Sequence, residues 1–518
     1  MSFERSAGLL LHPTSLPGRH GIGSLGLSAY EWVDFLASAG QRLWQVMPLG
    51  PTGYGDSPYQ CFSAFAGNPY LIDLDDLVER RLLQASDLAA APELPADRVD
   101  YGAVIPFKLA MLTRAFERLQ QDRSQTGDFA EFCASQAYWL DDYALFMALK
   151  EVHAGKVWNE WDEGVRRRRP DALNAARKAH ANEVERHKVW QWLFYEQWSK
   201  LLSYAHDRAI AVIGDIPIFI AYDSADVWAN PDMFYLDEYG NPTVVAGVPP
   251  DYFSVTGQRW GNPLYRWDRM TADGFRWWID RFKSTFEFFD IVRVDHFRGF
   301  EAYWEIPAEA PTAVEGRWVA GPGQPLFDAI RAALGKLPII AEDLGVITPE
   351  VERLRDDNDL PGMKVLQFAF AGNADDPYLP HNYERNAVVY TGTHDNDTTR
   401  GWYRHISEQE KDRVRRYLAR SDESIALELI RLATASVADL AIFPVQDVLD
   451  LGSEARMNTP GRPEGNWSWR LTEGMIGPWV APLLLEMATV YGRIPAGGAL
   501  DTPYRQSTTA AQGKEDAR

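Results

Sequence analysis

The chain alternates between short runs of apolar residues and longer stretches with helical spacing. Continuous aliphatic runs of four to eight residues are typical of parallel strands that are buried on both faces. Amphipathic stretches such as residues 348–356, 408–420 and 423–435 predict helices between them. The pattern predicts βαβ units. About eight apolar runs are present, and eight parallel strands are the number that closes a (β/α)8 TIM barrel, which is an α/β fold. The runs lie at residues 8–16, 42–49, 209–220, 288–295, 337–344, 363–370, 387–395 and 440–448.

The spacing of the predicted strands is uneven. Residues 50–208 separate the second strand from the third and are rich in helical pattern and tryptophan. Because a structureless loop of that length is rare in a compact domain, we predict an inserted helical subdomain there. Residues 221–287, with several Asn, Gly and Pro turns, predict a loop-rich insertion after strand 3. We expect one barrel domain over residues 1–495, which includes both insertions, and a C-terminal tail over residues 496–518.

The charge and composition of the chain argue against a nucleic-acid-binding or membrane-spanning protein. The formal net charge is −21, and the one dense basic run, residues 166–169, lies between acidic neighbours. Nucleic acid is therefore not expected as a partner. Hydrophobic residues make up 46% of the chain, but no run is long enough to span a membrane, and the N-terminus shows no signal peptide. With only two cysteines, Cys61 and Cys133, we expect a cytoplasmic protein without a membrane partner.

Carboxylates follow several of the predicted strands directly. Barrel enzymes carry their chemistry at the C-terminal ends of the strands, where Asp215, Glu342 and Asp395 are expected together with the pair Arg293 and Asp295. A single acid in such a place can simply cap a helix or pair with an arginine. Several like charges in one place raise the pKa of at least one of them and cost stability. The cluster therefore favours a catalytic site.

Enzymatic cleavage of a glycosidic bond needs two carboxyl groups, one on each side of the bond. Asp295, two residues from Arg293, shares a strand face with that cation and is the better nucleophile. The longer Glu342 is the better acid/base. Asp395, with His394, is expected to hold sugar hydroxyls and to stabilise an oxocarbenium-like transition state. The high aromatic content, 13% of the chain, adds side chains that can stack on a flat ligand.

These residues resemble a known group of enzymes. Arg293, Asp295 and His296, the Glu342 strand end, and His394 with Asp395 resemble three motifs of the α-amylase clan. Further segments resemble the amylomaltase, or 4-α-glucanotransferase, family, and the likeness runs from about residue 8 to about residue 491. They are residues 48–59 (PLGPTGYGDSPY), 67–70 (GNPY), 215–218 (DIPI), 223–228 (DSADVW), 247–254 (GVPPDYFS), 258–263 (QRWGNP), 456–461 (RMNTPG) and 466–470 (NWSWR).

The resemblance implies a specific reaction. It implies retaining transfer of α-1,4-glucan segments, from a maltooligosaccharide, starch or glycogen chain, to the 4-hydroxyl of glucose or another glucan. Asp295 would form the covalent glycosyl-enzyme, Glu342 would be the acid/base and Asp395 the stabiliser, with neither metal nor cofactor. Cys61 departs from the serine expected in its motif.

Other functions remain open at this point. The main alternative is a retaining α-glucan hydrolase of the same clan. A metal-dependent barrel enzyme using His296 and His394 is disfavoured, because no histidine pair has the spacing of a preformed site. A glucan-binding protein without activity is disfavoured by the complete set of three acids. The oligomeric state is undetermined, and a monomer is compatible with the sequence.

The candidate substrate-binding residues have different settings in the sequence. Tyr59 and Trp260 lie in Gly- and Pro-rich loops, where sugar stacking is favoured over core packing. Tyr101 fits either role, whereas tryptophans with helical spacing, such as Trp190 and Trp198, are predicted to pack in the core. The expected ligands are α-1,4-glucans, maltooligosaccharides and glucose. The full set of candidates is Ser57, Tyr59, Tyr101, Asp215, Trp260, Arg293, His394 and Asn466.

Overall fold

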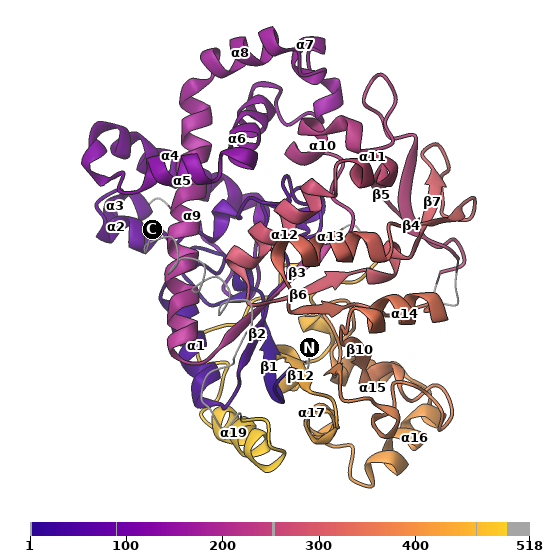
Figure 1. The fold of residues 1–518 in the computed structure, drawn as a ribbon. Coiled ribbons are helices and arrows are strands. Elements are labelled where there is room, and N and C mark those ends of the chain that lie inside the picture. Colours follow the sequence, from indigo (N-terminus) through magenta and orange to yellow (C-terminus); the bar gives the residue numbers. More distant parts are fainter. Residues whose placement is uncertain (1–2, 90, 251–253, 463, 495–518) are drawn as a thin grey trace, which may run out of the picture.

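A parallel β-barrel forms the centre of the computed structural model, which describes residues 3–89, 91–250, 254–462 and 464–494 (Figure 1). The strands are hydrogen-bonded in the order β10-β11-β12-β1-β2-β3-β6-β9. The amide of Ala341 in β9 donates to the carbonyl of Pro361, just before β10, and brings the two ends of the sheet together. The strands are β1 (Ser6–Leu10), β2 (Leu43–Gln45), β3 (Ala211–Pro217), β6 (Ile291–Asp295), β9 (Ile339–Ala341), β10 (Gly362–Val365), β11 (Ala387–Tyr390) and β12 (Leu440–Pro444).

Every barrel strand overlaps one of the predicted apolar runs, so the predicted (β/α)8 barrel is confirmed. Alternate residues of each strand point inward, because side chains in a strand change face at every position. The inward residues form an apolar cluster inside the barrel, including Leu43, Ile213, Ile291, Ile340 and Val388. The barrel interior is therefore a packed core rather than a pore.

Helices surround the barrel. The three amphipathic stretches appear as α14 (Pro349–Asp357), α16 (Glu408–Leu418) and α17 (Ile425–Ala435). Helix α16 begins with a capping box, in which Ser407 and Glu410 each bind the other's backbone amide. No helix in the described ranges combines the length and apolar character needed to cross a bilayer. The remaining outer helices are α1 (Leu27–Ser38), α12 (Arg276–Phe288), α13 (Gln324–Leu334), α15 (Thr399–His405), α18 (Val445–Val448) and α19 (Val480–Val490).

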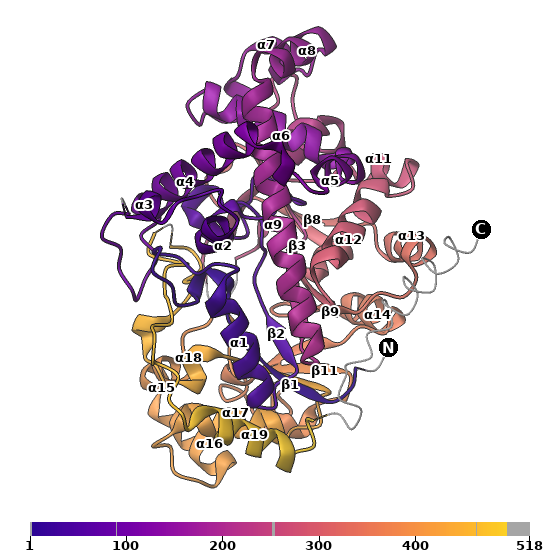
Figure 2. The ribbon, with the colours of Figure 1, turned by 90° about the vertical axis from the view of Figure 1, so that its left-hand side faces the viewer.

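The first insertion is helical and lies over one end of the barrel (Figures 1 and 2). Its last helix, α9, continues along the barrel wall into β3, so the insertion and the barrel share one hydrophobic core. The indole N–H groups of Trp190 and Trp198 donate to the carbonyls of Leu112 and Phe288, and both rings are buried as expected. The helices are α2 (Leu74–Glu79), α3 (Ala85–Leu88), α4 (Tyr101–Gln121), α5 (Phe129–Ser135), α6 (Ala137–Val152), α7 (Glu163–Arg166), α8 (Pro170–Ala179) and α9 (Ala181–Asp207).

The segment 221–287, predicted as a loop-rich insertion, combines loops with short regular elements. It contains α10 (Ala225–Ala229), α11 (Trp267–Ala272) and two strands, β4 (Val244–Val248) and β5 (Gln258–Pro263), before α12. The two strands join β7 (Ala302–Pro307) and β8 (Arg317–Ala320), which follow β6, in an antiparallel sheet of order β5-β4-β7-β8. Because the partner strands lie beyond a barrel strand in the sequence, local pattern alone did not predict this sheet. The expected tail, residues 496–518, lies outside the described residues.

The packing between β1 and β2 predicts a destabilising substitution. Gly8 is paired with Leu43, and a Cβ atom at Gly8 would lie 2.2 Å from the Leu43 carbonyl oxygen. Gly8→Ala should therefore lower the free energy of unfolding by about 1–3 kcal/mol, as overpacking of a core does. Gly102→Ala in α4 is the matched control, because its Cβ would have 3.4 Å to the nearest atom and alanine favours a helix. Denaturant unfolding of both variants measures the difference, and equal stabilities would contradict this account of the barrel.

Candidate active site

The inward-facing rows of two neighbouring strands change from apolar to charged at the barrel mouth. In β3 the row reads Ala211, Ile213 and Asp215, and in β6 it reads Ile291, Arg293 and Asp295. Glu342 follows β9 directly, and Asp395 lies in the loop after β11. Since all these strands are parallel, their C-terminal ends meet at one end of the barrel, and the predicted cluster of carboxylates is present there.

Arg293 joins two of the carboxylates. Its Nη1 lies 2.5 Å from Oδ2 of Asp215, and its Nη2 lies 2.9 Å from Oδ1 of Asp295. The Asp215 side chain is fully buried, whereas that of Asp295 is 28% exposed. One carboxylate therefore anchors the guanidinium from below, and the other is held by it at the open side of the site. Arg293 and Asp295 are two residues apart on one strand face, as the sequence analysis predicted.

Glu342 is held by backbone amides rather than by a cation. The amide of His296 donates to its Oε2 at 2.7 Å, and that of Leu344 donates to its Oε1 at 2.8 Å. His296 has a φ of 51°, a left-handed conformation at the end of β6 from which the chain turns into a 3-10 helix, Phe297–Phe300. The fixed backbone of this turn therefore sets the orientation of the Glu342 carboxyl group.

The two carboxyl groups have different pKa values. Burial raises the pKa of Glu342 to about 7, against the opposing charge of Arg293, and the negative charge of Asp295 adds to the rise. Burial also raises the pKa of Asp295, but Arg293 limits that rise, and the value is about 6. The contact with Arg293 thus favours the ionised form of Asp295, and burial favours the protonated form of Glu342.

Asp395 is kept ionised by its neighbours. Its Oδ1 accepts a hydrogen bond from Asn458 Nδ2 at 2.6 Å, and its Oδ2 lies 3.4 Å from His394 Nε2. Burial alone would raise the pKa of Asp395, but His394 and Asn458 outweigh it and hold that pKa well below its usual range. Burial alone would lower the pKa of His394, and the nearby Asp395 raises it instead.

Two partners of Asp395 were missed by the sequence reasoning. Besides Asn458, the guanidinium of Arg456 donates to the Asp395 carbonyl oxygen at 2.6 Å. Both residues belong to the motif at residues 456–461, which carried the resemblance but was not assigned a chemical role. Its spacing from β12 gave no sign that the loop returns to the end of β11.

Tyr59 links two sides of the mouth. Its hydroxyl donates to Asp215 Oδ2 at 2.8 Å and lies 2.9 Å from His394 Nε2. Its ring stacks on that of His394, with centroids 5.2 Å apart, and Trp467 packs against both rings. Tyr59 is thus part of the network that holds the carboxylates, and sugar stacking by its ring stays a prediction.

The other candidates differ in how close they come to the carboxylates. Ser57 accepts a hydrogen bond from the Tyr59 amide at 3.2 Å, and Trp260 packs edge-on against His296. Tyr101 donates to the Trp467 carbonyl, and Asn466 binds the backbone of Thr459 and Arg462 in its own loop. Ser57 and Trp260 therefore adjoin the site, whereas Tyr101 and Asn466 fix surrounding loops.

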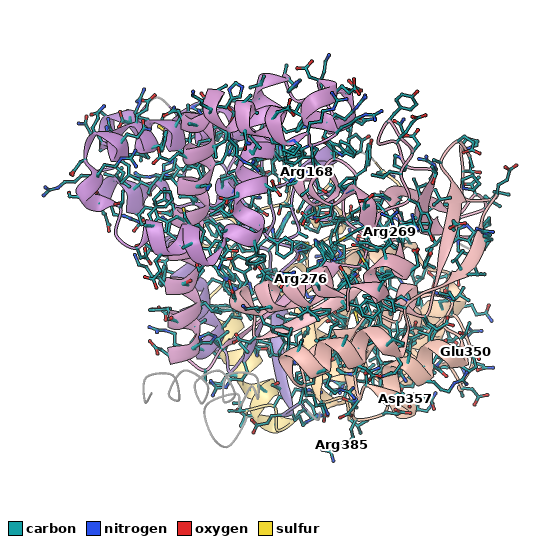
Figure 3. The ribbon with its side chains drawn as sticks, turned by 45° about the horizontal axis from the view of Figure 1, so that its top comes forward. Arg168, Arg269, Arg276, Glu350, Asp357 and Arg385 are labelled. Atoms are coloured by element: carbon teal, nitrogen blue, oxygen red, sulfur yellow. The ribbon has the colours of Figure 1, made fainter. Side chains whose placement is uncertain are left out.

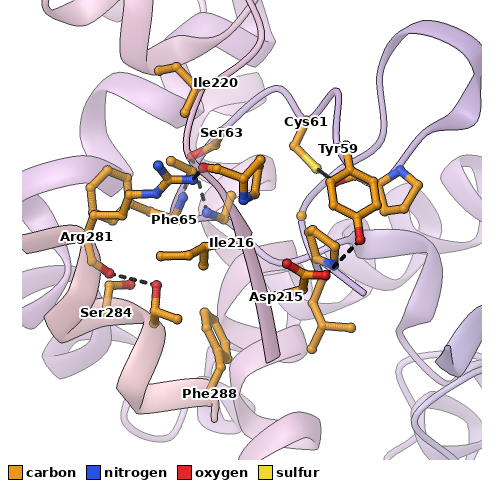
Figure 4. Close-up of a pocket in the computed structure, with 18 of the residues that line it drawn as sticks. Tyr59, Cys61, Ser63, Phe65, Asp215, Ile216, Ile220, Arg281, Ser284 and Phe288 are labelled. Atoms are coloured by element: carbon orange, nitrogen blue, oxygen red, sulfur yellow. Dashed lines mark hydrogen bonds between the residues drawn. The ribbon is translucent and has the colours of Figure 1, made fainter. Parts of the chain in front are cut away.

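A small cavity of about 60 Å³ lies behind Tyr59 and Asp215 (Figure 4). The buried Arg281 of α12 reaches it and donates to the carbonyls of Pro217 and Ile218, which fixes the chain just after Asp215. Cys61, also on the cavity wall, donates its thiol hydrogen to the Pro58 carbonyl, a bond that the expected serine would also make. The replacement therefore leaves the Tyr59 loop in place.

The histidines and acids of the site do not form a metal centre. Across residues 3–494, apart from the gaps given above, no group of three or more His, Cys, Asp and Glu side chains is arranged to hold a metal ion. The carboxylates instead bind a guanidinium, amides and an asparagine. The geometry therefore gives no support to the metal-dependent alternative.

Comparison with known proteins agrees with this geometry. A family profile described as 4-alpha-glucanotransferase matches residues 11–475. The 4-alpha-glucanotransferase of Thermus thermophilus is 56% identical over 95% of this chain and all of its own, and that of Synechocystis is 52% identical over 95% of this chain and 98% of its own. The amylomaltase from Streptococcus agalactiae in complex with acarbose has a TM-score of 0.92 and 40% identity, and it covers 95% of this chain and 100% of its own. The predicted resemblance is confirmed, and the chain belongs to the 4-alpha-glucanotransferase family.

Proposed function

We propose that the carboxylates of this glycosyltransferase carry out a retaining transfer of α-1,4-glucan segments. The observation that carries the proposal is the different treatment of two neighbouring acids. Asp295 forms an ion pair with the Arg293 guanidinium, whereas the Glu342 carboxyl group accepts hydrogen bonds from two amides and has the higher pKa. One acid is therefore prepared to attack as a carboxylate, and the other is prepared to donate a proton.

The first step forms a covalent intermediate. A carboxylate oxygen of Asp295 attacks the anomeric carbon of the donor sugar, and the bond from that carbon to the leaving glucan oxygen breaks. Glu342 gives its proton to this oxygen, so that the shortened glucan leaves as a neutral alcohol. The products are a glycosyl ester on Asp295 and an ionised Glu342.

The second step reverses these roles. The 4-hydroxyl of an acceptor glucose or glucan loses its proton to Glu342 and attacks the anomeric carbon, while the Asp295 carboxylate leaves. Two inversions at one carbon retain the α configuration. Asp395, held ionised by His394 and Asn458, stabilises the positive charge that develops on the sugar ring in both steps.

The substrate class follows from the same site. α-1,4-Glucans, maltooligosaccharides and glucose are uncharged, and the half-buried ring of Trp260 beside His296 offers an apolar surface to a sugar. The related amylomaltase from Streptococcus agalactiae forms a complex with acarbose. We also place the protein in the cytoplasm, a proposal that rests on Cys61 and Cys133, which form no disulfide.

Transfer and hydrolysis share the glycosyl ester and differ only in what discharges it. Water would give a hydrolase, the alternative left open by the residues, and family membership favours a sugar acceptor. Incubation of the pure enzyme with maltotriose should give glucose and a ladder of longer oligosaccharides, resolved by chromatography. Asp295→Asn should lose at least about a thousandfold of this activity, because it removes the nucleophile. Glucose and maltose without a ladder would contradict transfer.

The pKa values predict a bell-shaped pH profile. Activity requires an ionised Asp295, with a pKa of about 6, and a protonated Glu342, with a pKa of about 7. The kcat/KM should therefore fall below about pH 6, where Asp295 gains a proton, and above about pH 7, where Glu342 loses one. Because the two carboxyl groups interact, the apparent pKa values of the acidic and alkaline limbs of the profile describe the pair of residues and not each residue alone.

A donor with a good leaving group separates the two limbs. The first turnover of α-maltosyl fluoride needs no proton from Glu342, so in Glu342→Gln the release of fluoride should lose the alkaline limb and keep the acidic one. Stopped-flow fluoride detection in wild type and variant measures both profiles. An alkaline limb that persists in Glu342→Gln would rule out Glu342 as its source.

A further inference from the structure

Trp318 is a large aromatic residue whose ring is partly exposed at the surface. It lies in β8, the edge strand of the antiparallel sheet, and is 41% exposed. The guanidinium of Arg298 stacks on its ring at 3.9 Å, and Trp304, its cross-strand partner in β7, packs edge-on at 5.2 Å. One face of the indole is therefore covered by a cation, and the exposed surface belongs to the rest of the ring.

The orientation of this ring is fixed from several sides. Arg317, the residue before Trp318, donates to Glu305 across the strands at 2.7 Å and pins β8 to β7. Arg298 is buried, and its guanidinium also donates to the carbonyl of Val346. A side chain that is already held in place loses little conformational entropy when it binds a ligand.

A short chain of contacts connects Trp318 with the acid/base. Arg298, beneath the indole, is the third residue after Asp295, and it binds the carbonyl of Val346. Val346 lies two residues after Leu344, whose amide holds the Glu342 carboxyl group. The antiparallel sheet stands beside the barrel, with α14, which follows this loop, next to it (Figures 1 and 3). Trp318 is therefore connected through Arg298 with the loop that orients Glu342.

A lone apolar side chain on a surface is ordinary and needs no function. Here the ring is also held in place by Arg298 and Trp304, and Arg298 connects it with the backbone of Val346 in the loop that follows Glu342. The uncovered part of a rigid indole fits the apolar face of a neutral sugar better than it fits a charged partner.

We propose that Trp318 is a platform for a distal glucose unit on the acceptor side of a bound α-1,4-glucan. The proposal rests on the proposed function, in which Glu342 protonates the leaving oxygen. The departing chain and the next acceptor therefore both lie on the Glu342 side. Trp318 would thus select long acceptors over short ones and would leave the chemistry at Asp295 unchanged.

The test measures acceptor dependence with a donor that has no sugar on the acceptor side. α-Maltosyl fluoride loads the enzyme, and ¹⁴C-labelled glucose or maltohexaose then serves as acceptor. In Trp318→Ala the KM for maltohexaose should rise about three- to tenfold, the loss of one stacking contact, with the KM for glucose unchanged. Trp318→Phe, which keeps a flat ring, should restore most of the difference.

Trp479→Ala is the matched control. Trp479 is 52% exposed and precedes α19, at the opposite end of the molecule from β7, so its loss should change neither KM (Figure 1). An equal rise for both acceptors in Trp318→Ala would overturn the proposal, because it would mean that the indole only supports Arg298 and the Glu342 loop. Unchanged values in a Trp318→Ala variant with wild-type thermal stability would overturn it too. A wild-type enzyme that releases maltose and elongates neither acceptor would overturn the proposed function itself.

Discussion

The bridge from Arg293 to Asp215 and Asp295 is the interaction on which the site depends. A buried carboxylate without a partner is costly, and the guanidinium compensates Asp215 inside the barrel. The same cation faces the open mouth with its second nitrogen and limits the pKa of Asp295 there. The Arg293 side chain thus stabilises the buried Asp215 carboxylate and also adjusts the pKa of Asp295 at the barrel mouth. The strand period of two places all three residues on the inner face, so the barrel itself determines this geometry.

The sequence predicted the parts of the molecule that local pattern controls. The barrel strands follow continuous apolar runs, and Asp215, Asp295 and Glu342 were identified because each is an acid that follows the apolar residues of such a run. Contacts between distant segments could not be predicted in the same way. The antiparallel sheet pairs β4 with β7 across the barrel strand β6, and Asn458 reaches Asp395 from the loop after another strand. Their side chains carry no periodicity that indicates a partner.

Glu342 and Asp395 are held by different kinds of contact, backbone amides in one case and side chains in the other. Glu342 is oriented by two backbone amides, which no side-chain substitution can remove directly. Asp395, by contrast, depends on His394 and Asn458, whose side chains come from different loops. The orientation of the acid/base is therefore less sensitive to side-chain substitution than the ionisation of Asp395, which depends on its neighbours.

The pairing of the first strand with the last has a consequence for biosynthesis. β1 is hydrogen-bonded on one side to β2 and on the other to β12, in the register Ser6 to Leu440. At about 5–20 residues per second, a ribosome needs tens of seconds to deliver that partner. During this time β1 has an unpaired edge, and such edges invite association with other chains. Helices of the insertion such as α6 and α9 contact each other within residues 137–207, so these contacts can form before residue 440 has been made, whereas the barrel cannot close until then.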